Sequence, residues 1–234
     1  MLVILSAGIA PGLALLSYFY LKDQYELEPV LLVFKAFLFG AFLTFPIMFI
    51  QHVLDIEQIL QGNIFNAFIN IALLEEFFKW FILFFVVYQH GDFSEPYDGI
   101  VYGASVSLGF ATVENILYLI ADGVGTAFGR ALLPVSSHAL FGVIMGYYLG
   151  KAKFSLDRKM KQALIYSFTI PLLLHGFYDY ILLSKTKWIY YIIPFMLFLW
   201  WLGLKKVKQA HALSKKHHEM NTTENNQSAI DTIG

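Results

Sequence analysis

The sequence of 234 residues contains no cysteine. This absence excludes disulfide bonds, thiol catalysis and any metal site built on thiolates. Charged residues are also scarce, at 14% of the chain against 58% hydrophobic residues, whereas a soluble domain usually has about 25% charged residues. The net charge of −1 offers no excess of basic residues that would suit a nucleic acid. The composition predicts a protein surrounded by lipid, whose chemistry relies on histidines and carboxylates.

Seven apolar stretches are long enough, at roughly 17 to 25 residues, to form membrane-spanning helices. They cover residues 2–21, 30–50, 64–88, 99–121, 132–150, 163–183 and 188–204. The first lacks the basic start and the cleavage site of a signal peptide, so we expect it to remain in the mature protein. The sequence therefore predicts an all-α, polytopic transmembrane helix bundle over residues 1–208. A polar tail at 209–234 is predicted to be disordered and cytoplasmic.

Basic residues cluster in the loop after the fifth stretch and in the segment after the seventh. They are Lys151, Lys153, Arg158, Lys159 and Lys161 in the loop, and Lys205, Lys206, Lys208, Lys215 and Lys216 in the tail. With seven spans, both clusters fall on the same side of the membrane. The positive-inside rule makes that side cytoplasmic. The predicted orientation has the N-terminus outside and the C-terminus inside.

The third stretch contains three ionisable residues, each of which costs about 2.5 to 3.5 kcal/mol to place at the bilayer centre. Lys79 follows Glu75 by four positions and Glu76 by three. Its ammonium group can therefore pair with either carboxylate on one helical face. One carboxylate is left over, and it is a candidate general base that takes a proton from water.

Three later stretches add polar residues that could join the same site. The fourth contains Glu114 followed by Asn115, the fifth contains His138, and the sixth contains His175 and Asp179 one helical turn apart. That spacing lets the carboxylate fix the orientation of the imidazole. Counted from the outer helix ends at 1.5 Å per residue, the depths are roughly 9 to 18 Å for the following residues: Glu75, Glu76, Glu114, His138 and His175. The overlapping depths predict one site in the outer half of the membrane.

These residues occur in motifs that resemble those of the PrsW proteases. The motifs are Glu75-Glu76-Phe77-Phe78-Lys79, Phe110 to Glu114, Ser137-His138 and His175-Gly176-Phe177-Tyr178-Asp179. The resemblance extends from the segment 6–12 to about Lys208. It implies a hydrolase of the bacterial plasma membrane that makes the first, outer-side cut in a single-span anti-sigma factor. That cut leads to sigma factor release during a stress response.

The expected mechanism uses a glutamate-activated water. Glu75 or Glu76 takes the proton from water, while His175, oriented by Asp179, stabilises the oxyanion. Glu114 and His138 complete the polar cavity, and Lys79 and Asn115 support it. Adjacent glutamates project about 100° apart on a helix, so only one should face the water. The sequence leaves open which one.

A zinc-dependent variant is also open. His138, His175 and Glu76 would hold a Zn²⁺ ion, with water in the fourth position. The sequence contains no His-Glu-x-x-His motif, so each ligand would have to come from a different helix, as a bundle permits.

Three further interpretations remain. More distantly, the motifs resemble those of the CAAX prenyl endopeptidases, but Glu114 stands where that group has histidine, and Lys79 lies one residue nearer the glutamates than its arginine. His138 is the candidate substitute for the missing imidazole. A proton-coupled transporter or channel also uses intramembrane Glu, Lys and His, although the sequence shows no inverted repeat. An assembly factor would need these residues only for stability.

Asp55 lies outside the predicted site. We expect it to be solvated in a short outer loop.

Overall fold

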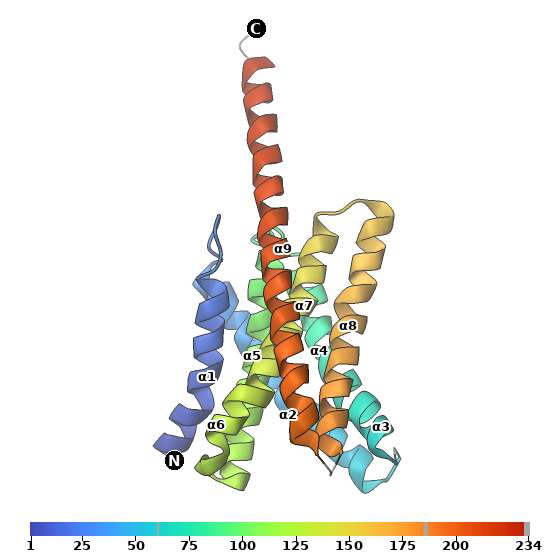
Figure 1. The fold of residues 1–234 in the computed structure, drawn as a ribbon. Coiled ribbons are helices and arrows are strands. Elements are labelled where there is room, and N and C mark those ends of the chain that lie inside the picture. Colours follow the sequence, from blue (N-terminus) through green and yellow to red (C-terminus); the bar gives the residue numbers. More distant parts are fainter. Residues whose placement is uncertain (60, 185–186, 232–234) are drawn as a thin grey trace.

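The computed structural model describes residues 1–59, 61–184 and 187–231, and every regular element in these ranges is a helix. The long helices run side by side in one bundle, with the two termini at opposite ends (Figure 1). They are α1 (Leu2–Tyr20), α2 (Val30–Ile56), α5 (Asp98–Asp122), α7 (Ser136–Lys153), α8 (Asp157–Leu183) and α9 (Trp188–Asp231). The predicted all-α bundle is confirmed.

All seven predicted stretches fall on helical segments. Five segments are long and apolar enough to cross a membrane, judged by length and composition: Leu2–Tyr20, Val30–Ile56, Asp98–Asp122, Val124–Lys153 and Trp188–Thr223. The other two predicted stretches, 64–88 and 163–183, contain five polar residues of the predicted site: Glu75, Glu76, Lys79, His175 and Asp179. The count of seven spans and the orientation remain predictions.

Helix α2 shows how its sequence directs one face towards lipid and one towards protein. Phe42 and Phe49 are exposed on the outside of the bundle, whereas Gly40 and Thr44 are buried. The Thr44 hydroxyl donates to the backbone carbonyl of Phe110 on α5, at 3.3 Å. An apolar outer face suits lipid, which cannot supply hydrogen bonds to polar groups.

Helices α5 and α7 form the buried centre of the bundle, and glycines allow their backbones to meet. A Cβ atom on Gly146 would collide with the carbonyl oxygen of Gly99, and one on Gly142 would collide with that of Gly103. Small residues four apart are typical of closely packed membrane helices. The contact fixes α5 and α7 relative to each other.

The third predicted span is not a uniform α-helix. It consists of α3 (Asn63–Phe65), the π-helix η1 (Asn66–Leu73), α4 (Leu74–Ile82) and the π-helix η2 (Leu83–Val87). The fifth span begins in a similar way: a turn of η3 (Val124–Thr126) and α6 (Ala127–Arg130) leads into the π-helix η4 (Ala131–Val135) and then α7. Pro134 within η4 has no N–H to donate, which favours a local departure from α-helix. π-Helical turns are frequent at functional sites.

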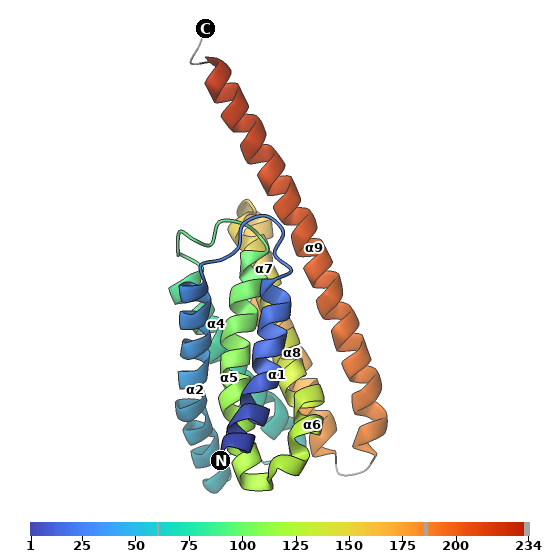
Figure 2. The ribbon, with the colours of Figure 1, turned by 90° about the vertical axis from the view of Figure 1, so that its left-hand side faces the viewer.

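Helix α9 continues past position 208 and projects beyond the rest of the bundle (Figure 2). The predicted boundary between residues 208 and 209 therefore falls inside a helix. Residues 232–234 of the predicted tail lie outside the described residues. The tail's disorder and its separation from the transmembrane domain stay predictions.

Candidate active site

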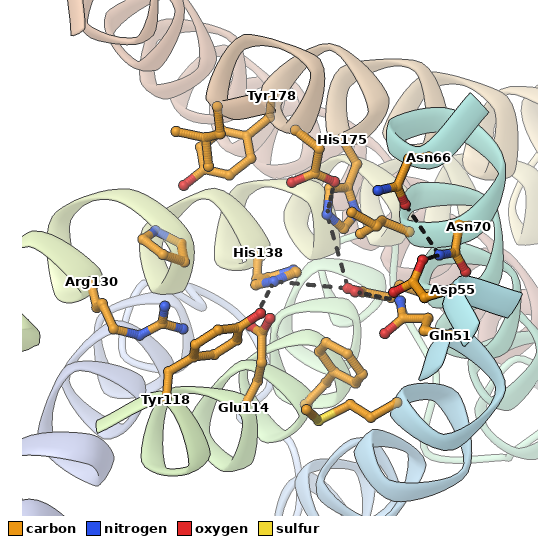
Figure 3. Close-up of a pocket in the computed structure, with 17 residues that line it drawn as sticks. Gln51, Asp55, Asn66, Asn70, Glu114, Tyr118, Arg130, His138, His175 and Tyr178 are labelled. Atoms are coloured by element: carbon orange, nitrogen blue, oxygen red, sulfur yellow. Dashed lines mark hydrogen bonds and ion pairs between the residues drawn. The ribbon is translucent and has the colours of Figure 1, made fainter. Parts of the chain in front are cut away.

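A cavity of about 290 Å³ lies among α2, η1, α4, α5, α7 and α8 (Figure 3). Its wall includes residues near the ends of helices, such as Asp55, Arg130 and Leu182. The cavity therefore lies towards the end of the bundle that holds the N-terminus (Figure 1). Five of the predicted site residues line it: Glu75, Glu114, His138, His175 and Asp179. Glu76, Lys79 and Asn115 lie behind this wall.

Lys79 is buried, and its ammonium group touches three polar side chains. Its Nζ atom lies 2.8 Å from Oε1 of Glu76 and 3.4 Å from Oε2 of Glu75. It also lies 3.1 Å from Nδ1 of His138 and 4.4 Å from the centre of the Phe110 ring. The lysine thus pairs with both glutamates, where the sequence allowed either.

His175 lies between two carboxylates. Its Nδ1 atom is 2.8 Å from Oε1 of Glu76, and its Nε2 atom is 3.1 Å from Oδ2 of Asp179. The ring stacks on Phe141, with 4.8 Å between ring centres. With Nδ1–H donating to Glu76, the neutral ring presents its Nε2 lone pair to the cavity, whereas in the protonated ring Nε2–H points at Asp179.

His138 approaches the same space from α7. Its Nε2 atom lies 3.2 Å from Oε2 of Glu114, and its ring centre lies 5.0 Å from that of His175. The Ser107 hydroxyl of α5 donates to the backbone carbonyl of His138 at 2.7 Å. The glycine contact between α5 and α7 therefore places Glu114 and His138 opposite each other.

The two glutamates have different surroundings. Glu76 is fully buried, and its Oε1 atom contacts both Lys79 and His175. Glu75 lines the cavity, and its Oε1 atom accepts a hydrogen bond from Nε2 of Gln51 at 3.2 Å. Its Oε2 atom lies 3.9 Å from Nε2 of His138 and 3.9 Å from Nε2 of His175. Glu75 is therefore the glutamate that faces the cavity.

The donor atoms in the cavity fit a zinc ion. Glu75, Glu76, His138 and His175 can each offer one ligand atom within 4.8 Å of the others. Ligand atoms of a tetrahedral zinc site lie about 3.4 Å apart, close to the separations between Glu75 and the two imidazoles. Within the described residues, Oε2 of Glu114 is buried, and its contact with Nε2 of His138 at 3.2 Å does not have hydrogen-bond geometry. A small cation among these atoms would satisfy their lone pairs.

One contact limits how zinc could bind. The ammonium of Lys79 has only donors, so Nδ1 of His138 accepts from it and the imidazole proton lies on Nε2. Coordination through Nε2 requires that proton to move to Nδ1. Lys79 must then turn towards Glu75 and Glu76, with which it is already in contact.

Several polar residues of the cavity wall were missed by the sequence analysis. Asp55 is exposed as expected, but it lies in the last turn of α2 rather than in a loop, and it accepts a hydrogen bond from Asn70 at 2.7 Å. Asn70 also donates to Asn66 at 3.1 Å. Gln51 and Asp55 are four apart in sequence, as are Asn66 and Asn70. This spacing could have indicated that each pair shares one helical face.

Arg130 is another cavity residue that the sequence did not single out. Its Nε atom donates to Oδ1 of Asn115 at 2.9 Å, and its guanidinium carbon lies 4.1 Å from the centre of the Tyr118 ring. Asn115 in turn donates to the carbonyl of Gly8 at 3.1 Å. Asn115 thus supports the site through Arg130 and does not line the cavity.

Comparison with known proteins selects among the functions that intramembrane acids and histidines allow. Residues 28–202 match the family described as PrsW family intramembrane metalloprotease. The chain belongs to this family. It is 61% identical to "Protease PrsW" of Bacillus subtilis (strain 168) over 214 residues, which cover 92% of this chain and 98% of that protein.

Other PrsW proteins match over a similar length. "Protease PrsW" of Geobacillus kaustophilus (strain HTA426) is 61% identical, with 92% of this chain and 95% of that protein covered. "Protease PrsW" of Clostridioides difficile (strain 630) is 34% identical, with 89% and 92% covered. No solved structure matches. The PrsW membership makes this chain a protease and a multi-pass membrane protein, as the sequence predicts.

Proposed function

We propose that this PrsW-family protease makes the first, outer-side cut in a single-span transmembrane anti-sigma factor, which leads to sigma factor release. The substrate is inferred from the family resemblance of the motifs. The position of the cavity supports the side of the cut, because it lies towards the end of the bundle that the predicted topology places outside. A substrate helix would need to unwind there to expose a peptide bond.

The observation that carries the hydrolytic mechanism is the position of Glu75. One of its carboxylate oxygens faces the Nε2 atoms of both His138 and His175 at 3.9 Å, inside the cavity. These three side chains would hold a zinc ion. Glu75 replaces Glu76 in the ligand set because Glu76 is occupied by Lys79 and His175. When bound, the zinc would polarise the peptide carbonyl and acidify water.

The remaining residues of the site prepare these groups and move protons. Glu114 takes a proton from the attacking water and returns it to the leaving amine. Glu76 accepts from Nδ1 of His175 and so keeps Nε2 directed at the cavity. Asp179 flanks the same Nε2 atom, and Gln51 holds the far oxygen of Glu75.

The metal-free arrangement uses the same geometry with different roles. Glu75 would then be the general base, and a protonated His175 would donate to the oxyanion. Metal content separates the two arrangements. The zinc arrangement predicts about one zinc per purified chain, loss of activity with a chelator, recovery on zinc addition, and loss of the metal in His138→Ala. Full activity after complete metal removal would establish the metal-free arrangement.

The experiment that tests the function follows a tagged single-span anti-sigma factor in cells. Wild type should shorten it from the outer side, whereas Glu75→Gln, Glu114→Gln, His138→Ala and His175→Ala should leave it whole at equal membrane levels. Glu57→Gln is the matched control, since Glu57 is exposed just beyond α2 and does not line the cavity. Wild type that cuts other membrane proteins but leaves the anti-sigma factor whole would reject the substrate and keep the protease.

A further inference from the structure

A second group of carboxylates lies at the opposite end of the bundle from the cavity. There the loop after α1 and the loop before α5 come together beside α9 (Figure 2, blue and green loops). Asp23, Glu95 and Asp98 can each place one oxygen within 4.8 Å of the others. Glu95 is only 5% exposed and Asp98 is fully buried. We call these three residues the loop carboxylates.

The loop carboxylates have oxygen atoms without partners. Within the described residues, Oε1 of Glu95 is buried without a hydrogen-bond partner, and the Glu95 carboxyl group faces that of Asp23. The backbone N–H groups of Ser94 and Glu95 both donate to Oδ2 of Asp98 at 2.7 Å, which leaves Oδ1 buried and unpartnered. Both carboxylate oxygens of Asp23 are in the same state. A buried acceptor normally has a partner, so these oxygens indicate a missing ligand.

Lys153 acts on the charge of Asp98, and His211 on that of Asp23, from beyond ion-pair distance. In the part of the chain that the structure describes, none of the ion pairs involves Asp23, Glu95 or Asp98. Glu28 adds a fourth buried carboxylate nearby, which accepts a hydrogen bond from the Tyr102 hydroxyl. Burial, together with the charges of Asp98 and Asp23, raises the pKa of the Glu95 carboxyl to about 8. Burying several acids together is unfavourable in free energy, and a bound cation would offset that cost.

We propose that Asp23, Glu95 and Asp98 bind a divalent cation of the kind that prefers oxygen ligands, Mg²⁺ or Ca²⁺. The donors are all carboxylate oxygens, which suit these ions, whereas the imidazoles of the cavity suit zinc. The bound cation joins the loop after α1 to the loop before α5 and to the first turn of α5. This site is independent of the zinc proposed for the catalytic cavity.

The cation would also stabilise the surface on which α9 packs. The backbone N–H of Tyr97, between Glu95 and Asp98, donates to Oγ of Ser214 at 3.0 Å. The Tyr97 ring stacks on His211 of α9, with 4.4 Å between ring centres. Binding between the two loops therefore fixes the segment that holds α9 in place.

The test uses the full chain, purified in detergent and stripped with a chelator, to which Mg²⁺, Ca²⁺ or Mn²⁺ is added. We expect at least one of them to raise the melting temperature by roughly 5 to 10 °C at a concentration 100 times its dissociation constant. Glu95→Gln and Asp98→Asn should lose the shift and one equivalent of bound cation. Asp92→Asn, an exposed acid of the same loop, should keep both.

Melting temperatures of the variants and of wild type, measured in the presence of a chelator, distinguish a cation site from a purely structural role. Removing one of several crowded acids should leave the metal-free melting temperature of Glu95→Gln equal to or above that of wild type. A structural role would instead lower it with and without the cation. Asp23→Asn, at a partly exposed position, serves as the second variant if Asp98→Asn does not fold. Glu75→Gln must keep the shift, because Glu75 lies in the other site. A wild-type protein that shows no shift with any of the three ions overturns the proposal.

Discussion

The Nε2 atom of His175 lies 3.1 Å from Oδ2 of Asp179, one turn further along α8. Removal of a carboxylate beside a catalytic or metal-binding imidazole typically costs 10- to 100-fold in activity or metal affinity. We therefore expect Asp179→Ala to slow substrate cleavage by about 10- to 100-fold, and His175→Ala to slow it further. Cleavage rates measured at matched membrane levels test this order. Unchanged cleavage in Asp179→Ala would show that Glu76 alone orients the ring.

Substitutions of the two neighbouring glutamates should have similar effects on activity but different effects on stability. Glu76→Gln leaves Lys79 and His175 without their shared carboxylate, and breaking a buried ion pair costs about 3 to 5 kcal/mol. We expect both Glu76→Gln and Glu75→Gln to be inactive. Glu75→Gln should be closer to wild type in stability, since Lys79 keeps its contact with Glu76 at 2.8 Å. Thermal unfolding in detergent, beside a cleavage assay, measures both. Equal loss of stability in the two variants would contradict the different roles.

Backbone packing between α5 and α7 gives a prediction that is independent of the chemistry. A Cβ on Gly146 would collide with the carbonyl oxygen of Gly99, so Gly146→Ala should destabilise the protein by about 1 to 3 kcal/mol. The matched control is Gly129→Ala, because a Cβ on Gly129 meets no atom within 4 Å. Melting temperatures of the two variants should differ, with the control at or slightly above wild type.

Arg130 should act on substrate binding. Its Nη2 atom is buried and has no hydrogen-bond partner within the described residues, although the side chain lines the cavity. A hydrogen bond from a charged donor contributes about 1.5 to 3 kcal/mol, so Arg130→Met should raise KM about tenfold or more. Asn115→Ala, which removes the acceptor for Nε of Arg130, should change KM in the same direction by less. A fall in kcat at constant KM would instead place Arg130 in the chemical step.

Much of the fold follows from the sequence because lipid leaves few alternatives for an apolar stretch. Each predicted span is helical, and α5 and α9 begin within one residue of the predicted starts at positions 99 and 188. The end of α2 was missed by six residues, at Ile56 rather than position 50. The prediction stopped at polar residues such as Gln51 and Asp55. These residues stay helical because they face the cavity, not lipid.

The candidate site was predictable in its members but not in their arrangement. Depth along each helix could be counted from the sequence, and it correctly placed Glu75, Glu114, His138 and His175 around one cavity. Which of two adjacent glutamates faces that cavity depends on the rotation of α4. That rotation is set by the preceding π-helix, whose hydrogen bonding has no simple sequence signature.

The same π-helix should tolerate substitutions better than insertions or deletions. Each residue turns an α-helix by about 100°, so a single deletion or insertion within η1 would rotate α4 and carry Glu75 away from the cavity. Substitutions on its lipid-facing side would leave that angle unchanged. The segment ahead of the two glutamates therefore acts as a spacer whose length, more than its composition, determines which acid is presented to the substrate.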